Sequence, residues 1–249
     1  MAKKLNDIKE YIESSNLDFN EHLIKVLNKD VIDFLERLKK LTNVYVFSGV
    51  IRNYFLRQSS IRDLDLVVEF NEEARSFIES NEFIKNSFDG YKLDFSDLKI
   101  DLWFMEDTWA INTYQKILEF YVPEFITSTA FFNFSCILFD FQSKEFIIRK
   151  EFLRFIRDKE LELVFEPNPN VKLCIINSLY YSDKYELKIG QKLKEYLIRK
   201  LNIVDPHFQK IQLKHFGEIF YSDNVVIERI NSLKLEMTTA NKRDDAMPA

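Results

Sequence analysis

Residues 47–56 read FSGVIRNYFL, and residues 62–67, a few positions later, read RDLDLV. The first stretch completes a run, Val44-Tyr45-Val46-Phe47, whose β-branched and aromatic residues are typical of a short buried strand. Ser48-Gly49 breaks that run, and residues 50–56 have the pattern of the first turns of a helix. The second stretch begins by alternating polar and apolar residues, as a strand with one wet face does. The sequence therefore predicts a strand, a tight turn, a helix and a second strand, in that order.

The two aspartates of the second strand, Asp63 and Asp65, are two positions apart, so the period of a strand puts both carboxylates on one face. Neighbouring carboxylates repel each other strongly in apolar surroundings unless a cation neutralises them. Mg²⁺ prefers hard oxygen ligands and commonly takes one or two carboxylates together with substrate phosphates. A third carboxylate, Asp101, occurs in the apolar run 99–104. Three carboxylates on adjacent strands could hold two Mg²⁺ ions for phosphoryl transfer. Taken alone, Asp63 and Asp65 could instead belong to a strand face that is exposed to solvent.

Only four of the 249 residues are glycine, where an average usage of about 7% would give roughly seventeen. These four lie far apart, at Gly49, Gly90, Gly190 and Gly217. A dinucleotide-binding G-x-G-x-x-G, a P-loop and a G-x-S-x-G nucleophile elbow are therefore excluded. A phosphate site has to work with one glycine. The turn Ser48-Gly49 could form such a phosphate site, because backbone N–H groups at a helix N-terminus bind anions and small residues allow the anion to approach closely. Arg52 adds a cation to the same helix.

The composition, 46% hydrophobic and 30% charged, predicts a soluble globular protein that is large enough for a real core. No apolar run approaches the length of a membrane span, and the polar N-terminus has no apolar signal segment. Cys136 and Cys174 lie in apolar runs, so no disulfide framework is predicted and the cytoplasm is the default location. The net charge of −5 argues against strong non-specific binding of nucleic acid. The 24 phenylalanines are interpreted as core packing.

The pattern along the chain divides it into four ranges and predicts an α+β fold. Residues 1–42 are expected to form N-terminal helices that pack against the domain after them, and residues 43–148 a mixed α/β head domain. Residues 149–236 are expected to be helical and neck-like, with a break marked by Pro167 and Pro169. The polar residues 237–249 are expected to be a disordered tail.

Taken together, the order of these motifs resembles the head domain of the bacterial poly(A) polymerase and CCA-adding enzyme family, the class II tRNA nucleotidyltransferases. That family belongs to the DNA polymerase β-like nucleotidyltransferases, and its pattern is a Gly-Gly pair, an Arg-Asp, a Leu-rich helix and an Asp-x-Asp. Residues 99–104 look like its strand with a further carboxylate, and residues 129–140 like its later Asn-containing segment. The resemblance covers about residues 43–200. It implies a polymerase β-like head, in which helices flank a small mixed sheet, followed by an all-helical neck.

The resemblance also implies roles for individual residues. Asp63, Asp65 and Asp101 are implied to be catalytic and to bind two Mg²⁺ ions, with Asp101 able to activate the attacking hydroxyl. The implied nucleotide-binding residues are Ser48, Gly49, Arg52, Asn53, Arg62 and Asn133. Ser48 and Asn53 depart from the family's Gly and Asp. The neck positions that are arginine-rich in the family correspond roughly to Lys172, Cys174, Asn177 and Tyr180 here.

The function implied by the resemblance is template-independent transfer of NMP from an NTP, with ATP the foremost candidate, to an acceptor hydroxyl with release of pyrophosphate. The foremost acceptor is the 3′ end of an RNA, as in tRNA. Two alternatives stay open. The lost glycine and neck arginines suggest a non-catalytic nucleotide- or RNA-binding relative, and a toxin or defence nucleotidyltransferase could act on tRNA, a protein or a small molecule. No membrane partner is expected, and the sequence leaves the oligomeric state open.

Overall fold

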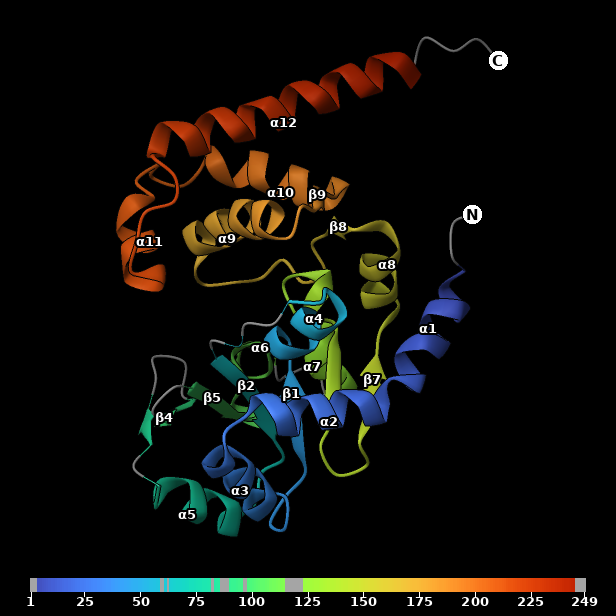
Figure 1. Ribbon diagram of the computed structural model, residues 1–249. Helices are drawn as coiled ribbons and strands as arrows, with labels where there is room; N and C mark the ends of the chain where they lie inside the picture. The colour runs from blue at the N-terminus through green and yellow to red at the C-terminus, as the bar shows by residue number, and fades with distance from the viewer. Residues whose placement is uncertain are drawn as a thin grey trace. The chain divides into compact units, whose positions relative to one another are not determined.

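The computed structural model describes residues 4–58, 61, 63–81, 83–85, 90–95, 98–114 and 123–244. The chain divides into two compact units, Met1–Asp158 and Lys159–Ala249, which are described separately below. Figure 1 labels the elements of both. The strands of the first unit are β1 (Val44–Phe47), β2 (Asp63–Val68), β3 (Ile84–Lys85), β4 (Tyr91–Phe95), β5 (Leu98–Phe104), β6 (Ile137–Asp140) and β7 (Glu145–Ile148). Its helices are α1 (Leu5–Ser14), α2 (Asn16–Val26), α3 (Lys29–Leu38), α4 (Gly49–Phe55), α5 (Glu72–Glu79), α6 (Trp109–Tyr114), α7 (Pro123–Ser128) and α8 (Lys150–Asp158), with short 3-10 turns η1 (Met105–Asp107) and η3 (Asn133–Ser135).

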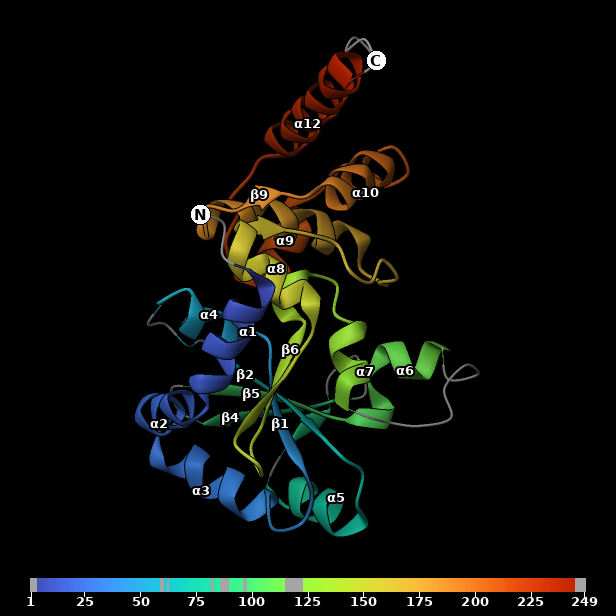
Figure 2. The same cartoon turned by 90° about the vertical axis from the view of Figure 1, so that its right-hand side faces the viewer.

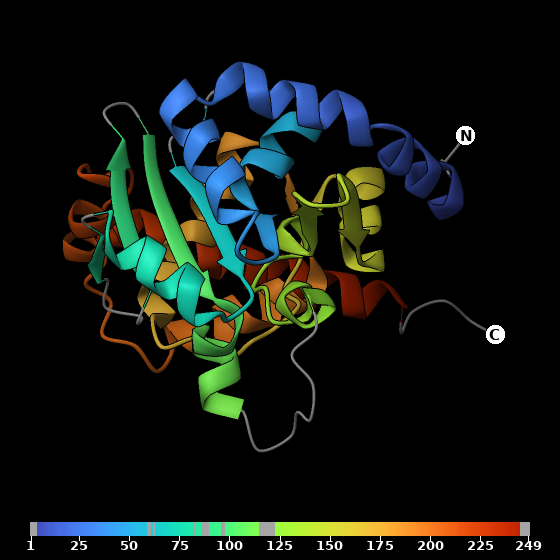
Figure 3. The ribbon, with the colours of Figure 1, turned by 90° about the horizontal axis from the view of Figure 1, so that it is seen from below.

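These strands form one seven-stranded sheet with the order β3-β4-β5-β2-β1-β6-β7. Strands β2 and β5 run parallel, and the other neighbouring pairs are antiparallel. Figure 3 shows β4, β5 and β2 side by side in green to teal. The predicted order of strand, turn, helix and strand is confirmed by β1, the Ser48-Gly49 turn, α4 and β2. The sheet is mixed and flanked by helices, so the α+β class is confirmed.

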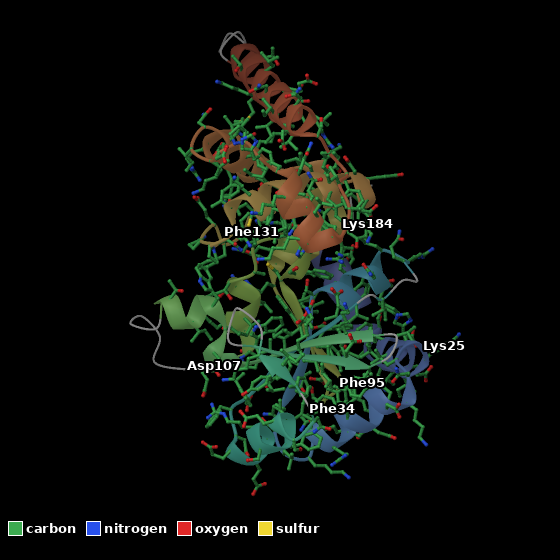
Figure 4. The ribbon with its side chains drawn as sticks, turned by 90° about the vertical axis from the view of Figure 1, so that its left-hand side faces the viewer. Lys25, Phe34, Phe95, Asp107, Phe131 and Lys184 are labelled. Atoms are coloured by element: carbon green, nitrogen blue, oxygen red, sulfur yellow. The ribbon has the colours of Figure 1, made fainter. Side chains whose placement is uncertain are left out.

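One face of the sheet is apolar from β4 to β7, because alternate residues of these strands point into the core. On β2 these are Leu64, Leu66 and Val68, all fully buried. Helices α2, α3 and α5 cover this face with aromatic side chains, and the rings of Phe34 on α3 and Phe95 on β4 lie 5.9 Å apart (Figure 4).

The opposite face is divided between an apolar part and a polar part. Tyr45, Val67 and Leu138 are buried there in one cluster with Ile111 of α6 and Ile126 of α7. Figure 2 shows α6 and α7 on this side of the strands and α2 and α3 on the other. Towards the beginning of β2 the same face is only half-buried, and it is there that the strand carries its aspartates.

Helix α8 belongs to the first unit, although residues 149–236 were expected to form the neck. Its Phe152 and Phe155 are fully buried. Their rings lie 5.8 Å from the ring of Phe55 and 5.9 Å from the ring of Phe134, respectively. The boundary between the units therefore follows Asp158 instead of residue 148, because the apolar side of α8 completes the core of the head. The N-terminal helices also lie in this unit, where Phe19 of α2 packs 4.8 Å from Phe139 of β6.

The second unit is mainly helical. Its elements are β8 (Glu160–Leu161), α9 (Val171–Lys184), β9 (Lys188–Ile189), α10 (Gln191–Leu201), α11 (Gln209–Phe216) and α12 (Asp223–Asp244). Strands β8 and β9 form a short parallel pair that the helical pattern did not predict. Helix α12 continues to Asp244, so residues 237–244 of the expected disordered tail are helical, and 245–249 lie outside the described residues. Just before this stretch, Glu236 of α12 forms an ion pair of 3.0 Å with Lys194 of α10.

Both cysteines are free and buried, as expected from their apolar surroundings. Phenylalanines are prominent among the largest fully buried side chains, in agreement with their interpretation as core. Within the part of the chain that the structure describes, no helix is long and apolar enough to cross a membrane.

Candidate functional site

The turn between β1 and α4 is held in an unusual conformation. Ser48, the residue between the two elements, has φ 53° and ψ −94°, a region that favours glycine. Its Oγ lies 2.6 Å from Oγ of Ser135, a buried residue of η3. The hydrogen bond joins the turn to the Asn-containing segment that follows much later in the chain. The sequence contained no signal for this partner, because the two serines are 87 residues apart.

The space above Gly49 is bordered by two of the expected site residues. A β-carbon placed on Gly49 would lie 3.8 Å from Oδ2 of Asp65 and 4.0 Å from Nη2 of Arg52. A carboxylate and a guanidinium therefore both face the glycine. This arrangement places one group suited to a cation and one suited to a phosphate at the same turn. Helix α4 has only seven residues, so this site rests on the turn and its side chains rather than on a long helix dipole.

Arg52 is buried, with 7% of its surface exposed, and its guanidinium is held from two sides. Nε and Nη2 each donate to Oδ1 of Asn53 at 3.3 Å, and Cζ lies 4.6 Å above the ring of Phe134. Asn53 was expected to bind nucleotide, and in the structure its amide oxygen accepts from Arg52. Packing against Phe134 and bonding to Asn53 orient the guanidinium, which reduces the entropy lost when it binds an anion.

The three expected carboxylates lie on one face of two neighbouring strands. In the parallel pair of β2 and β5, Asp65 is the register partner of Asp101, and Asp63 is the partner of Lys99. Neighbouring strands are about 4.8 Å apart, so the backbones of Asp65 and Asp101 lie side by side. On the other side of β2, Asp65 is paired with Phe47, the residue just before the turn. The sheet thus brings Asp65 between Asp101 and the Ser48-Gly49 turn.

The side chains of these residues do not form a ready-made cage. Among the described residues, no group of three histidine, cysteine or acidic side chains is placed to hold a metal ion. Oδ1 of Asp101 instead lies 3.5 Å from Nζ of Lys92 on β4, which is half exposed. Mg²⁺ often needs only one or two protein carboxylates, with water and substrate phosphates completing its octahedron. Asp63, Asp65 and Asp101 offer carboxylate oxygens, which are the ligands that Mg²⁺ prefers. The sequence did not indicate that Lys92 would lie beside Asp101.

Two further expected residues complete the account of the head. Asn133 is buried, with 4% of its surface exposed, at the start of η3, the turn that also carries Ser135. It therefore belongs to the segment that is bonded to the Ser48 turn. Arg62 lies outside the described residues.

In the second unit, three of the neck positions have partners within the chain. Nζ of Lys172 lies 3.5 Å from Oδ2 of Asp205, and Cys174 is buried. The ring of Tyr180 packs against Phe216 and Phe220, with centroids 4.9 and 4.7 Å away. These side chains stabilise the helical unit itself, and none repeats the chemistry of an arginine.

No family model matches the chain, and no curated protein matches it. Its fold, however, is found in solved structures. A CCA-adding enzyme with CTP matches with a TM-score of 0.61 at 13% identity, over 87% of this chain and 54% of that one. The complex with ATP matches with a TM-score of 0.60 at 16% identity, over 86% and 54%. The Thermotoga maritima CCA-adding enzyme complexed with tRNA gives 0.61 at 15% identity, over 86% and 53%. The chain spans about half the length of these structures, and the likeness shows a shared fold.

Proposed function

We propose that this chain is a Mg²⁺-dependent, template-independent nucleotidyltransferase that moves NMP from an NTP to the 3′ hydroxyl of an RNA. The fold that it shares with CCA-adding enzymes is the starting point of this proposal. The observation that carries it is the position of Asp65 between the Ser48-Gly49 turn and Asp101 on the sheet. A fold alone does not imply an activity, which depends on the residues at the site.

In the proposed reaction, the acceptor oxygen attacks the α-phosphorus of the NTP. A new O–P bond forms, the bond to the β-phosphate oxygen breaks, and pyrophosphate leaves with its electron pair. Asp63 and Asp65 would hold Mg²⁺ together with Asp101, and the bound ion would neutralise charge on the phosphates. The carboxylate of Asp101 would accept the proton of the attacking hydroxyl.

The turn residues would bind the part of the NTP that leaves. Gly49 lets phosphate oxygens approach the backbone, because it has no side chain between Asp65 and Arg52. The oriented guanidinium of Arg52 would bind a phosphate or the sugar. Ser48, Asn53 and Asn133 would support this pocket through the contacts that join the turn, α4 and η3. ATP is the first nucleotide to test, and a tRNA-like 3′ end is the first acceptor.

The test measures transfer of label from α-labelled NTPs to a short RNA, with Mg²⁺ present and after its removal by EDTA. Replacing Asp63→Asn and Asp65→Asn together should lower the rate on the order of 10³-fold, because preorganised charge at the phosphoryl centre is lost. The matched control replaces Asp18→Asn and Asp33→Asn, two exposed aspartates of α2 and α3, and should keep the wild-type rate. Equal labelling by wild type and by the Asp63/Asp65 variant would remove these residues from the mechanism.

A second candidate, a non-catalytic nucleotide-binding protein, is favoured by one observation. Asp101 is paired with Lys92, and no three-carboxylate cage is formed among the described residues. Equilibrium dialysis with labelled ATP separates the two candidates. Binding that needs no Mg²⁺, together with absence of transfer by the wild type, supports this second candidate and contradicts the first.

A further inference from the structure

The carboxylate face continues beyond Asp101 into a strip of alternating charge on β4 and β5. Lys92 on β4 is the register partner of Asp101, and Asp94 is the partner of Lys99. Lys92, Asp94 and Lys99 are all exposed. The two lysines are diagonal neighbours, which places their β-carbons roughly 7–8 Å apart. Two ammonium groups therefore stand next to the carboxylates, on the side away from the Ser48-Gly49 turn.

The strip borders an open hollow of about 450 Å³. Its walls include Lys92, Lys99 and Asp94, and the side chain of Ile84 on β3 adds an apolar surface that is 74% exposed. A positively charged groove that follows the nucleic-acid backbone is one part of how proteins bind single strands, and Lys92 and Lys99 supply such charge in this hollow. The hollow has room for part of a nucleotide chain rather than for an ion alone.

The order of features across the sheet assigns a side to each substrate. From β4 to β1 come Lys92 on β4, then Lys99 and Asp101 on β5, then Asp63 and Asp65 on β2, and then the turn after β1. In phosphoryl transfer the attacking and leaving oxygens lie roughly in line, on opposite sides of the phosphorus. If the leaving pyrophosphate is held at the turn, the attacking hydroxyl comes from the side of the strip.

We propose that Lys92 and Lys99 bind backbone phosphates of a single-stranded RNA acceptor and so bring its 3′ end to Asp101. This inference rests on the proposed function and deepens it by locating the acceptor. In the structure Nζ of Lys92 lies 3.5 Å from Oδ1 of Asp101; the lysine side chain is 48% exposed and that of Asp101 is 18% exposed, and an ion pair with a solvent-exposed partner contributes little to stability. Lys92 can therefore exchange the carboxylate for a phosphate oxygen when RNA arrives, which leaves Asp101 available to the hydroxyl.

The experiment measures binding of a fluorescently labelled short single-stranded RNA by anisotropy, without NTP or Mg²⁺, at several salt concentrations. Each phosphate contact of a single strand contributes about −0.7 to the slope of log K against log salt. The double variant Lys92→Gln/Lys99→Gln should have a slope less steep by about 1.4. Between about 50 and 200 mM salt, the wild type should therefore lose about sevenfold more affinity than the variant.

Two further variants make the result specific. The control Lys25→Gln/Lys29→Gln removes the same charge from exposed residues of α2 and α3 and should keep the wild-type slope. The variant Lys92→Arg/Lys99→Arg keeps both charges and should also keep it. An unchanged slope in the glutamine variant, an equal change in the control, or a changed slope in the arginine variant overturns the proposal. Circular dichroism of each variant checks that it is folded.

The same proteins are then tested for Mg²⁺-dependent ATP binding by equilibrium dialysis. The wild type should bind ATP when Mg²⁺ is present, because the proposed function needs the nucleotide and the ion together. Normal ATP binding together with an unchanged RNA slope contradicts only the acceptor strip. Failure of the wild type to bind ATP with Mg²⁺, while its RNA slope changes as expected in the glutamine variant, contradicts only the proposed function.

Discussion

The strained turn at Ser48 leads to a prediction about stability in which two substitutions of one residue differ. Ser48 has a positive φ of 53°, and its hydroxyl is bonded to Ser135 at 2.6 Å. Replacement by alanine keeps the β-carbon and removes the hydroxyl. Replacement by glycine removes both. Because the lost hydrogen bond is the same, the difference between the variants isolates the effect of a β-carbon at this backbone conformation.

The magnitude follows from three contributions. Leaving the buried hydroxyl of Ser135 without its partner costs about 1–3 kcal/mol in either variant. A β-carbon in a left-handed conformation costs roughly 1–2 kcal/mol, and glycine removes that cost. The greater freedom of glycine in the unfolded chain costs about 0.5–1 kcal/mol. Ser48→Gly should therefore be more stable than Ser48→Ala by about 1 kcal/mol, and Ser48→Ala should be less stable than the wild type by about 1–3 kcal/mol.

Urea unfolding followed by tryptophan fluorescence measures this difference. Both tryptophans, Trp103 and Trp109, lie in the unit Met1–Asp158, so their emission reports the unit that contains the turn. Ser135 supplies the matched control, because it loses the same hydrogen bond but has no positive φ. At Ser135 the order should reverse, with glycine less stable than alanine. The reasoning fails if alanine at Ser48 is as stable as glycine, or if the order at Ser135 is the same as at Ser48.

Two further predictions concern other parts of the molecule. A β-carbon at Gly90 would lie 2.2 Å from Nε1 of Trp103, so Gly90→Ala should displace the ring, lower the free energy of unfolding by about 1–3 kcal/mol and shift the tryptophan emission; stability within about 0.5 kcal/mol of the wild type would contradict this. In the second unit, burial raises the pKa of Asp183, but hydrogen bonds from Arg229 and Tyr221 outweigh burial and hold it below its ordinary value. Because the pKa of Asp183 is lower in the folded than in the unfolded protein, the ionised carboxylate stabilises the fold above the unfolded-state pKa, and this stabilisation is lost as the pH falls through the folded-state pKa. Asp183→Asn should therefore be less stable than the wild type by about 1 kcal/mol near pH 6, and this difference should disappear towards pH 3. Urea unfolding followed by circular dichroism at both pH values checks this, and a gap that stays constant would show that the ion pair is not its cause.

Local patterns in the sequence predicted the parts of the site that depend on neighbouring residues. The change from a strand to Ser48-Gly49 and then to a helical pattern placed the turn, because glycine and β-branched residues act on the backbone where they stand. The spacing of Asp63 and Asp65 placed both on one face, because the period of a strand does not depend on its partners. Asn71 also acts locally, as the cap of α5: its Oδ1 accepts from the backbone N–H of Glu73 at 2.8 Å and of Ala74 at 3.3 Å.

Predictions from the sequence differed from the structure where contacts between distant segments decide which core an element joins. Helix α8 was expected to belong to the neck, yet its phenylalanines are buried against Phe55, which lies far earlier in the chain, and Phe134, which lies shortly before the helix. A helical pattern shows that one side is apolar, but it does not show which core takes that side. Residues 237–244 were expected to be disordered because they are polar, whereas in the structure α12 continues through them to Asp244.

By itself, the sequence determined the turn, the glycine that it can use, the shared face of Asp63 and Asp65, and the exclusion of glycine-rich phosphate cradles. Tertiary structure alone decided that β5 pairs with β2 so that Asp101 stands beside Asp65, that β4 then brings Lys92 to Asp101, and that Ser135 bonds to Ser48. The physical reason is the range of each effect. Backbone preference and side-chain period act over a few residues, whereas strand order and register depend on the packing of both faces of the sheet.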